Sequence, residues 1–244
     1  HYNQSILLEW NEPVNQKVLE MCLEAIVQHH DSLRLVYANE AGTWKQSYQE
    51  IEEPSLFELR VFEASEADNF EKHCQELHAS FELSNGPLFK ALLQKDEEKD
   101  LLLLVGHHLV IDGVSWRIIL EDLKSLYTTV NAGLTPKLPL KTDTFKHWVD
   151  RSSEWSTNTN DQQKAYWEEV VSKSVTALPV DIESGNNRIG DVIERGFGLN
   201  EEETNAILTQ CYDAYKTEIN DILITAFVAA AKDVFKQDRF AIMM

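Results

Sequence analysis

Residues 101–105, the run Leu-Leu-Leu-Leu-Val, constrain the fold more than any other feature of the sequence. Successive side chains of a strand point to opposite faces, so a run without polar residues is apolar on both faces. Such a strand belongs inside a sheet that is covered on both sides. The run lies within a strand expected over residues 100–107, which pairs as a hairpin with residues 88–94 across the charged segment 95–99. The sequence therefore predicts a sheet with this strand in its interior.

The rest of the chain combines segments with the hydrophobic period of a helix and segments with that of a strand. Apolar residues at helical spacing predict helices over residues 14–30, 65–80, 114–130, 145–155, 161–171, 201–215 and 220–235. Short apolar or alternating runs predict strands over residues 5–10, 33–37, 44–48, 56–62, 192–199 and from residue 240. The apolar side chains of residues 220–235 are expected to pack in a core, with Asn220 or Asp221 as the helix cap.

Segment 172–187 has no strong periodicity and contains Pro179 and Gly185, which is typical of a linker. We therefore expect an N-terminal lobe over residues 1–175, a linker over 176–189 and the start of a second lobe over 190–244.

The composition argues against several classes of protein. The chain has 244 residues and a formal net charge of −19, from 22 Lys and Arg against 41 Asp and Glu. This balance argues against binding to nucleic acid or anionic lipid, because phosphate groups attract clustered basic residues. No apolar run approaches the about 20 residues of a membrane-spanning helix. The three cysteines, Cys22, Cys74 and Cys211, lie far apart in the sequence and suit a reducing compartment, so we expect a cytoplasmic protein.

A pair of histidines follows the apolar strand directly. The chain reads Gly106-His107-His108-Leu109-Val110-Ile111-Asp112-Gly113-Val114-Ser115-Trp116. A histidine at a strand end can move protons near neutral pH, because imidazole titrates there. Adjacent histidines on a strand point to opposite faces, which argues against a shared metal ion, and we expect no metal site. Asp112 is expected to fix the loop by pairing with a cation, and Gly113 to permit a tight turn. A packing role alone is the simpler alternative for the histidine pair.

This segment resembles the His-His-x-x-x-Asp-Gly active-site motif of the condensation superfamily of nonribosomal peptide synthetases. The longer string HHLVIDGVSWRIILEDL is similar to the epimerization branch in particular, where Val-Ser-Trp-Arg commonly follows the glycine. Three further stretches resemble segments of the same family in the expected order, namely His1-Tyr2-Asn3-Gln4-Ser5, His30-Asp31-Ser32-Leu33-Arg34 and Tyr215-Lys216-Thr217-Glu218-Ile219-Asn220-Asp221-Ile222-Leu223.

The resemblance implies a fold and an activity. The fold is α/β, an α+β two-layer sandwich, with one chloramphenicol-acetyltransferase-like lobe and the beginning of a second similar lobe. The activity is that of an isomerase in antibiotic biosynthesis, which converts an L- to a D-configured aminoacyl or peptidyl thioester. The resemblance implies no cofactor of the enzyme's own and a substrate that is tethered through the 4′-phosphopantetheine of a peptidyl carrier protein domain. That domain, upstream in the same chain, and other synthetase domains are the implied partners, with no nucleic acid or membrane.

The resemblance also assigns residues. His108, the second histidine of the motif, is the catalytic candidate. Asp112 is expected to pair with Arg34 of the His-x-x-Leu-Arg segment and to have a structural role. The residues expected to support the motif are His107, Asp112, Gly113, Ser115, Trp116 and Arg34.

The sequence departs from the family pattern in its second half. The Glu-Gly-His-Gly-Arg-Glu motif, which carries the partner glutamate in the family, is absent from this sequence. The second lobe has barely begun at residue 244, so we expect a fragment that is inactive alone. Three alternatives remain open: a condensation domain that forms peptide bonds between carrier-bound substrates, a non-catalytic binding or structural fragment, and a CoA-dependent acyltransferase. Trp116 with Arg117 favours the epimerization branch over the condensation branch.

Overall fold

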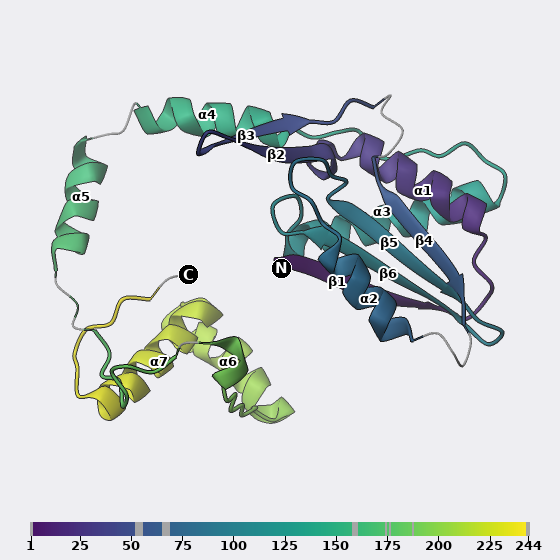
Figure 1. Ribbon diagram of the computed structural model, residues 1–244. Coiled ribbons are helices and arrows are strands. Elements are labelled where there is room, and N and C mark those ends of the chain that lie inside the picture. The colour runs from purple at the N-terminus through teal and green to yellow at the C-terminus, as the bar shows by residue number, and fades with distance from the viewer. Residues whose placement is uncertain are drawn as a thin grey trace. The chain divides into compact units, whose positions relative to one another are not determined.

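The computed structural model describes residues 2–51, 56–64, 69–157, 161–173, 175, 177–186 and 188–242. The chain divides into two compact units, His1–Asn158 and Thr159–Met244 (Figure 1). The boundary between lobes expected at residues 176–189 stays a prediction.

A four-stranded sheet in the order β1-β6-β5-β4 forms the centre of the first unit. Its strands are β1 (Asn3–Trp10), β4 (Glu58–Glu63), β5 (Phe89–Lys95) and β6 (Asp100–His107). β6 pairs antiparallel with β1 and β5, whereas β4 runs parallel to β5. A separate hairpin joins β2 (Leu35–Glu40) to β3 (Thr43–Tyr48). β6 is therefore an interior strand, and the prediction for residues 101–105 is confirmed.

Helices cover both faces of this sheet. The helices of the first unit are α1 (Gln16–His29), α2 (Phe70–Ala79), α3 (Gly113–Asn131) and α4 (Phe145–Thr157). Leu102 and Leu104 of β6 are buried in one cluster with side chains of α1 and α3. Leu103 and Val105 point the other way and are buried against Leu77 of α2, which crosses the opposite face (Figure 1). The apolar run therefore contributes side chains to a hydrophobic cluster on each face of the sheet. The predicted mixed α/β class is confirmed.

The second unit consists of helices and irregular segments in its described residues. Its helices are α5 (Asp161–Ser172), the short 3-10 helix Ile189–Asp191, α6 (Glu201–Tyr215) and α7 (Ile219–Phe235). α6 begins as predicted, because the Asn200 and Glu203 side chains accept hydrogen bonds from each other's backbone N–H groups. α7 is capped by Glu218 rather than by Asn220 or Asp221. Asp221 instead accepts a hydrogen bond from the Glu218 N–H at 3.0 Å.

Three other predictions are corrected in this structure. Residues 192–199 and 240–242 form no strand, since a strand needs a neighbour for its backbone groups and the described part of the second unit contains none. The α7 side chains do not form a core, because Leu223 and Phe227 are 52% and 58% exposed and Ala231 alone is buried among the described residues of that helix. α2 begins at Phe70, after the cap Asn69, and residues 65–68 of the expected helix lie outside the described residues.

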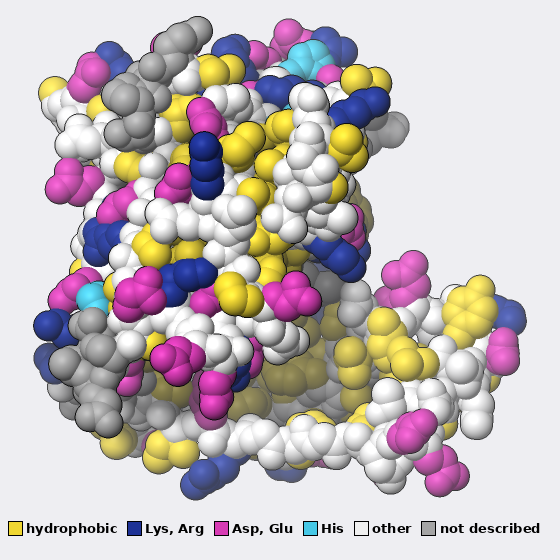
Figure 2. Space-filling model, turned by 90° about the vertical axis from the view of Figure 1, so that its right-hand side faces the viewer, with side chains coloured by type: hydrophobic (Ala, Val, Ile, Leu, Met, Phe, Trp, Pro, Cys, Tyr) yellow, Lys and Arg dark blue, Asp and Glu magenta, His cyan; other side chains and the backbone are white. Residues whose placement is uncertain are grey.

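The described residues also show the character of the helices and the distribution of surface charge. No helix in the described ranges has both the length and the apolar character needed to cross a membrane. On the face in Figure 2, Lys and Arg side chains are interspersed with Asp and Glu.

Candidate active site

The loop after β6 holds the two histidines against the sheet. The backbone N–H of His108 donates to the Tyr2 carbonyl at 2.7 Å, which extends the pairing between β1 and β6 past the strand end. The N–H of Val110 donates to the His107 carbonyl at 2.9 Å. Val110 and Ile111 then bury their side chains in the core cluster under α3. The loop is therefore anchored on both sides of His108, whose own side chain is exposed.

Gly106 is the glycine that this loop requires. A β-carbon built on Gly106 would lie 2.6 Å from Ile111 Cγ2, closer than van der Waals contact allows, because the loop folds Ile111 back over the strand. Gly113, expected to permit a tight turn, is the first residue of α3 and has no positive φ. A β-carbon there would meet no atom within 4 Å. The expectation for Gly113 is therefore wrong.

The two glycines give opposite predictions for the same substitution. We expect Gly106→Ala to lower the free energy of unfolding by about 1–3 kcal/mol, because the added methyl overpacks a closed core. We expect Gly113→Ala to change it by less than about 0.5 kcal/mol, because the site is open. Urea denaturation of both variants measures the difference. Equal stabilities would show that the loop does not close over Gly106 as described.

Two hydrogen bonds hold the His108 side chain, and a third orients its partner Gln4. The indole Nε1–H of Trp116 donates to Gln4 Oε1 at 3.1 Å. Gln4 Nε2 lies 3.2 Å from His108 Nε2, and His108 Nδ1 lies 2.9 Å from the Ile111 carbonyl oxygen. An indole N–H can only donate and a carbonyl can only accept, so Gln4 turns its NH₂ group toward His108. A neutral His108 then has its hydrogen on Nδ1 and a lone pair on Nε2.

Sequence reasoning did not single out Gln4 as a functional residue. Gln4 lies on the same face of β1 as Ile6 and Leu8, which pack on the core cluster. A polar residue at the end of such an apolar face was the available signal.

The hydrogen bonding of His107 favours the opposite tautomer. Its Nδ1 accepts a hydrogen bond from the Leu109 N–H at 3.2 Å, so the hydrogen of the neutral ring lies on Nε2. Burial, reinforced by the neighbouring His108, lowers the pKa of His107 and favours that neutral form. Its ring lies near Phe81, with ring centroids 6.4 Å apart. A fixed backbone N–H therefore holds the Nδ1 lone pair of His107, whereas the Nε2 lone pair of the exposed His108 is held only by a side-chain amide, which substrate can displace. His108 is therefore the better candidate base.

Asp112 caps α3 and does not pair with Arg34. Its carboxylate Oδ1 accepts from the Ser115 N–H at 2.8 Å and from the Ser115 hydroxyl at 2.6 Å. Hydrogen bonds from Ser115 lower the pKa of Asp112. Asp112 and Ser115, two residues of the predicted motif, therefore bind each other. Asp112 serves as a helix cap and not as one half of an ion pair.

Arg34 is buried elsewhere, at the end of α1. Its guanidinium pairs with Asp31 at 2.9 Å and donates to the carbonyls of Val27 at 3.0 Å and Gln28 at 2.9 Å. The last carbonyls of a helix have no partner within the helix, so Arg34 satisfies them. Burial alone would raise the pKa of Asp31, but hydrogen bonds from Lys141 and Arg34 outweigh it and lower that pKa. The Asp112–Arg34 pair expected from the sequence is therefore wrong, because local partners occupy the guanidinium.

The corrected role of Asp112 changes the expected effect of removing it. Asp112→Ala should cost about 1 kcal/mol of stability, the usual loss for a helix cap, and not the roughly 3–5 kcal/mol of a broken buried ion pair. Asp112→Asn should retain most of the stability, because the amide oxygen can still accept the Ser115 N–H. Thermal unfolding of the two variants measures both effects. A loss above about 3 kcal/mol for Asp112→Ala would restore the ion-pair assignment.

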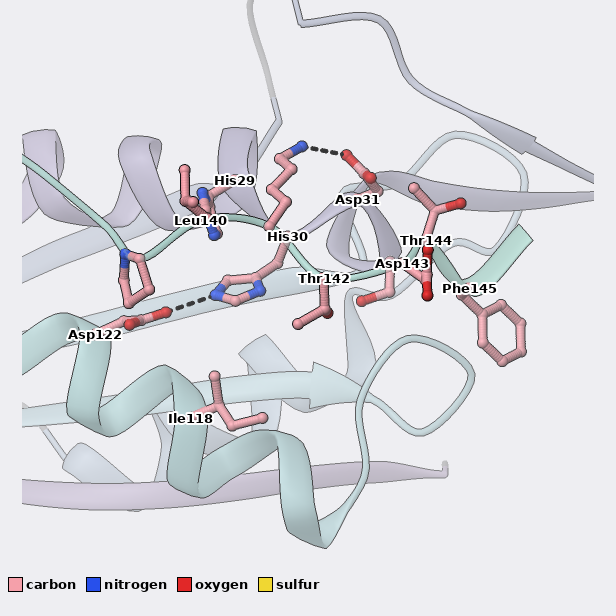
Figure 3. Close-up of a pocket in the computed structure, with 13 residues that line it drawn as sticks. His29, His30, Asp31, Ile118, Asp122, Leu140, Thr142, Asp143, Thr144 and Phe145 are labelled. Atoms are coloured by element: carbon pink, nitrogen blue, oxygen red, sulfur yellow. Dashed lines mark hydrogen bonds and ion pairs between the residues drawn. The ribbon is translucent and has the colours of Figure 1, made fainter. Parts of the chain in front are cut away.

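A pocket of about 330 Å³ lies between the end of α1, the helix α3 and residues 139–145 (Figure 3). His30 Nε2 and Asp122 Oδ2 are 2.7 Å apart across it, and Lys141 Nζ lies 2.8 Å from Asp31 Oδ1. Its described lining residues do not include His107 or His108. The sequence signal for Asp122 was a carboxylate on the apolar stripe of α3, where it is buried.

The described residues contain no group of three or more His, Cys, Asp or Glu that could hold a metal ion.

The sequence matches the family described as "Condensation domain" over residues 1–244. The chain belongs to the condensation-domain family. Similar curated proteins include surfactin synthase subunit 1 of Bacillus subtilis (strain 168), which is 38% identical over 249 residues. That match covers 99% of this chain and 7% of the relative. Surfactin synthase subunit 2 of the same organism is 35% identical over 248 residues, covering 99% of this chain and 7% of that protein. This condensation-domain chain thus spans under a tenth of the length of either relative.

Solved structures give the same family and fold. The epimerization domain from the third module of tyrocidine synthetase B is similar with a TM-score of 0.87 and 32% identity. That match covers 97% of this chain and 55% of the solved chain. The starter condensation domain of rhizomide synthetase has a TM-score of 0.58 and 19% identity, over 70% of this chain and 42% of that chain, and shows likeness of fold alone. The predicted resemblance to the condensation superfamily of nonribosomal peptide synthetases, with its chloramphenicol-acetyltransferase-like fold, is confirmed.

Proposed function

We propose that this chain is part of an epimerization domain, an isomerase that inverts the Cα of an aminoacyl or peptidyl thioester. The observation that carries the proposal is the pair of hydrogen bonds to His108, which place its hydrogen on Nδ1 and an acceptor lone pair on Nε2 at the end of an interior strand. The likeness to the tyrocidine synthetase epimerization domain, over 97% of this chain, supports this branch of the family. The substrate is held by the 4′-phosphopantetheine of a peptidyl carrier protein domain, and other synthetase domains are the further partners.

The chemistry needs a base of the kind that His108 supplies. A thioester acidifies its Cα–H, because the electron pair left on carbon spreads onto the carbonyl oxygen. His108 Nε2 takes the Cα proton and becomes an imidazolium, and the substrate becomes an enolate. Hydrogen-bond donors near the developing oxyanion lower the barrier further. Because the thioester itself accepts the electron pair, the step needs no separate cofactor.

Inversion also needs a second proton donor. The His108 imidazolium can return its proton only to the face from which it took it, which restores the L configuration. The D product forms when another group protonates the opposite face of the enolate. No residue of this chain is assigned to that second role.

The family itself favours a second candidate function, peptide-bond formation. In a condensation reaction, the same Nε2 lone pair would take a proton from the attacking amine of a second carrier-bound substrate. The two reactions differ in what they require: condensation needs an acceptor amine, whereas epimerization needs only one thioester.

The test first supplies the carrier-bound thioester alone and then adds an acceptor amine, to separate epimerization from condensation. The full-length protein that carries this chain is loaded with an L-aminoacyl thioester on its carrier, and the released amino acid is separated by chiral chromatography. We expect a mixture of L and D forms without an acceptor, and no D form from an amide-linked mimic, whose Cα–H is less acidic. Retention of the L form together with dipeptide formation after an acceptor is added would support condensation. No reaction in either case would support a non-catalytic role.

A further inference from the structure

We propose that Gln4 and Trp116 are positioning residues, which act as one relay to hold His108 in the tautomer whose Nε2 is unprotonated and accepts from the Gln4 amide until substrate displaces that amide. The inference rests on the proposed function and deepens it, because it explains how Nε2 of the base is kept unprotonated. The tautomer and protonation of the His108 ring can be measured whether or not the protein catalyses epimerization.

The direction of each hydrogen bond in the relay follows from donor chemistry. Trp116 has one polar atom, the indole N–H, and its side chain is buried in the core cluster. Its bond to Gln4 Oε1 at 3.1 Å therefore sets which end of the amide faces the indole. The NH₂ end then faces His108 Nε2 at 3.2 Å, and only an unprotonated nitrogen can accept it. The buried indole thus favours, through Gln4, the tautomer of His108 with its hydrogen on Nδ1.

The second nitrogen of His108 reinforces this assignment. Nδ1 lies 2.9 Å from the Ile111 carbonyl oxygen, which accepts but cannot donate. Ile111 is buried under α3 and packs over Gly106, so this carbonyl has a fixed position. Both ends of the ring are therefore held by groups that agree on one tautomer, with hydrogen on Nδ1.

The relay joins parts of the chain that are far apart in sequence. Gln4 lies on β1, and Trp116 lies in the first turn and a half of α3, 112 residues later. Val-Ser-Trp-Arg and the segment that contains Gln4 are both stretches in which the sequence resembles the epimerization branch. Their contact at His108 gives a physical reason for a tryptophan and a glutamine at these two positions.

The discriminating variant is Gln4→Glu, which keeps the shape of the side chain but replaces the NH₂ donor with a carboxylate oxygen. The carboxylate can still accept from Trp116, but it favours a protonated His108 over a neutral one. His107 and Asp112 are the described titratable groups that interact with His108, and neither changes in this variant. We expect the acid limb of the pH–kcat profile to move up by about one pH unit or more. A side chain with only a packing role would leave the profile unchanged.

Two further variants test whether the residues act together. Gln4→Leu and Trp116→Phe should each lower kcat about tenfold to 100-fold with little change in KM, less than the 10²–10⁴-fold expected for losing a general base. The double variant should be no worse than Gln4→Leu alone, because residues in one network are not additive. Gln46→Glu and Trp44→Phe, on the exposed surface of β3, are matched controls that should behave as wild type.

A chemical probe separates this proposal from the proposed function. Diethyl pyrocarbonate modifies the unprotonated nitrogen of neutral histidine, and mass spectrometry of the His108 peptide in the folded full-length protein measures the rate. Gln4→Glu should slow modification at pH 7 and move its pH dependence upward, even in a protein that shows no epimerization. Unchanged modification and additive losses of kcat would overturn the relay. Absence of Cα inversion with a shifted modification profile would overturn only the proposed function.

Discussion

His108→Ala is expected to slow Cα proton exchange on the carrier-bound thioester by about 10²–10⁴-fold, the usual contribution of a general base. The substitution removes the Nε2 lone pair, and His107 does not replace it because a backbone N–H, which cannot swing away as the Gln4 side chain can, occupies its Nδ1. The measurement is the rate of deuterium incorporation by the full-length protein in D₂O, followed by mass spectrometry. His147→Ala, on the exposed surface of α4, is the control and should leave the rate unchanged. A folded His108→Ala protein that exchanges at the wild-type rate would remove His108 from the mechanism.

Arg34→Ala is expected to lower the free energy of unfolding by about 3 kcal/mol, because a buried acceptor left without its donor costs about 1–3 kcal/mol and Asp31 keeps only Lys141 as a partner. The loss also leaves the Val27 and Gln28 carbonyls at the end of α1 without their donor. Arg34→Lys should recover only part of this loss, since an ammonium cannot reproduce the planar fork of donors.

The control for Arg34 is a surface ion pair. Arg151 pairs with Glu154 on α4, where both side chains are about two-thirds exposed. Arg151→Ala should therefore cost at most about 1 kcal/mol. Urea denaturation of the three variants measures these differences, and equal losses for Arg34→Ala and Arg151→Ala would show that the Arg34 network does not stabilise the fold.

Elements with strong local signals could be predicted from the sequence. The interior position of β6 follows from an apolar run on both faces, and α6 has the bounds, residues 201–215, that helical spacing predicted. The strand expected at residues 192–199 was wrong because alternation gives the pattern of a strand but not its neighbour. The buried core expected of α7 was wrong for a related reason, since an apolar helix is buried only where other elements cover it.

The candidate site shows the same limit at the level of single residues. The order His107, His108 and Asp112 predicted a loop between a buried strand and a helix, and that loop is present. The partner of Asp112 could not be predicted, because the choice between Ser115 and a distant arginine depends on where α1 ends. Gln4 could not be placed beside His108 either, since their contact spans 104 residues of sequence.

The most direct test of the account follows the Cα–H bond itself. The wild-type full-length protein is loaded with the L-aminoacyl thioester in one experiment and the D-aminoacyl thioester in another, both in D₂O and without an acceptor substrate. The account predicts that both thioesters gain deuterium at Cα and approach the same ratio of L to D. Thioesters that keep their Cα hydrogen and their configuration, in a protein that forms peptide bonds once an acceptor is added, would contradict it.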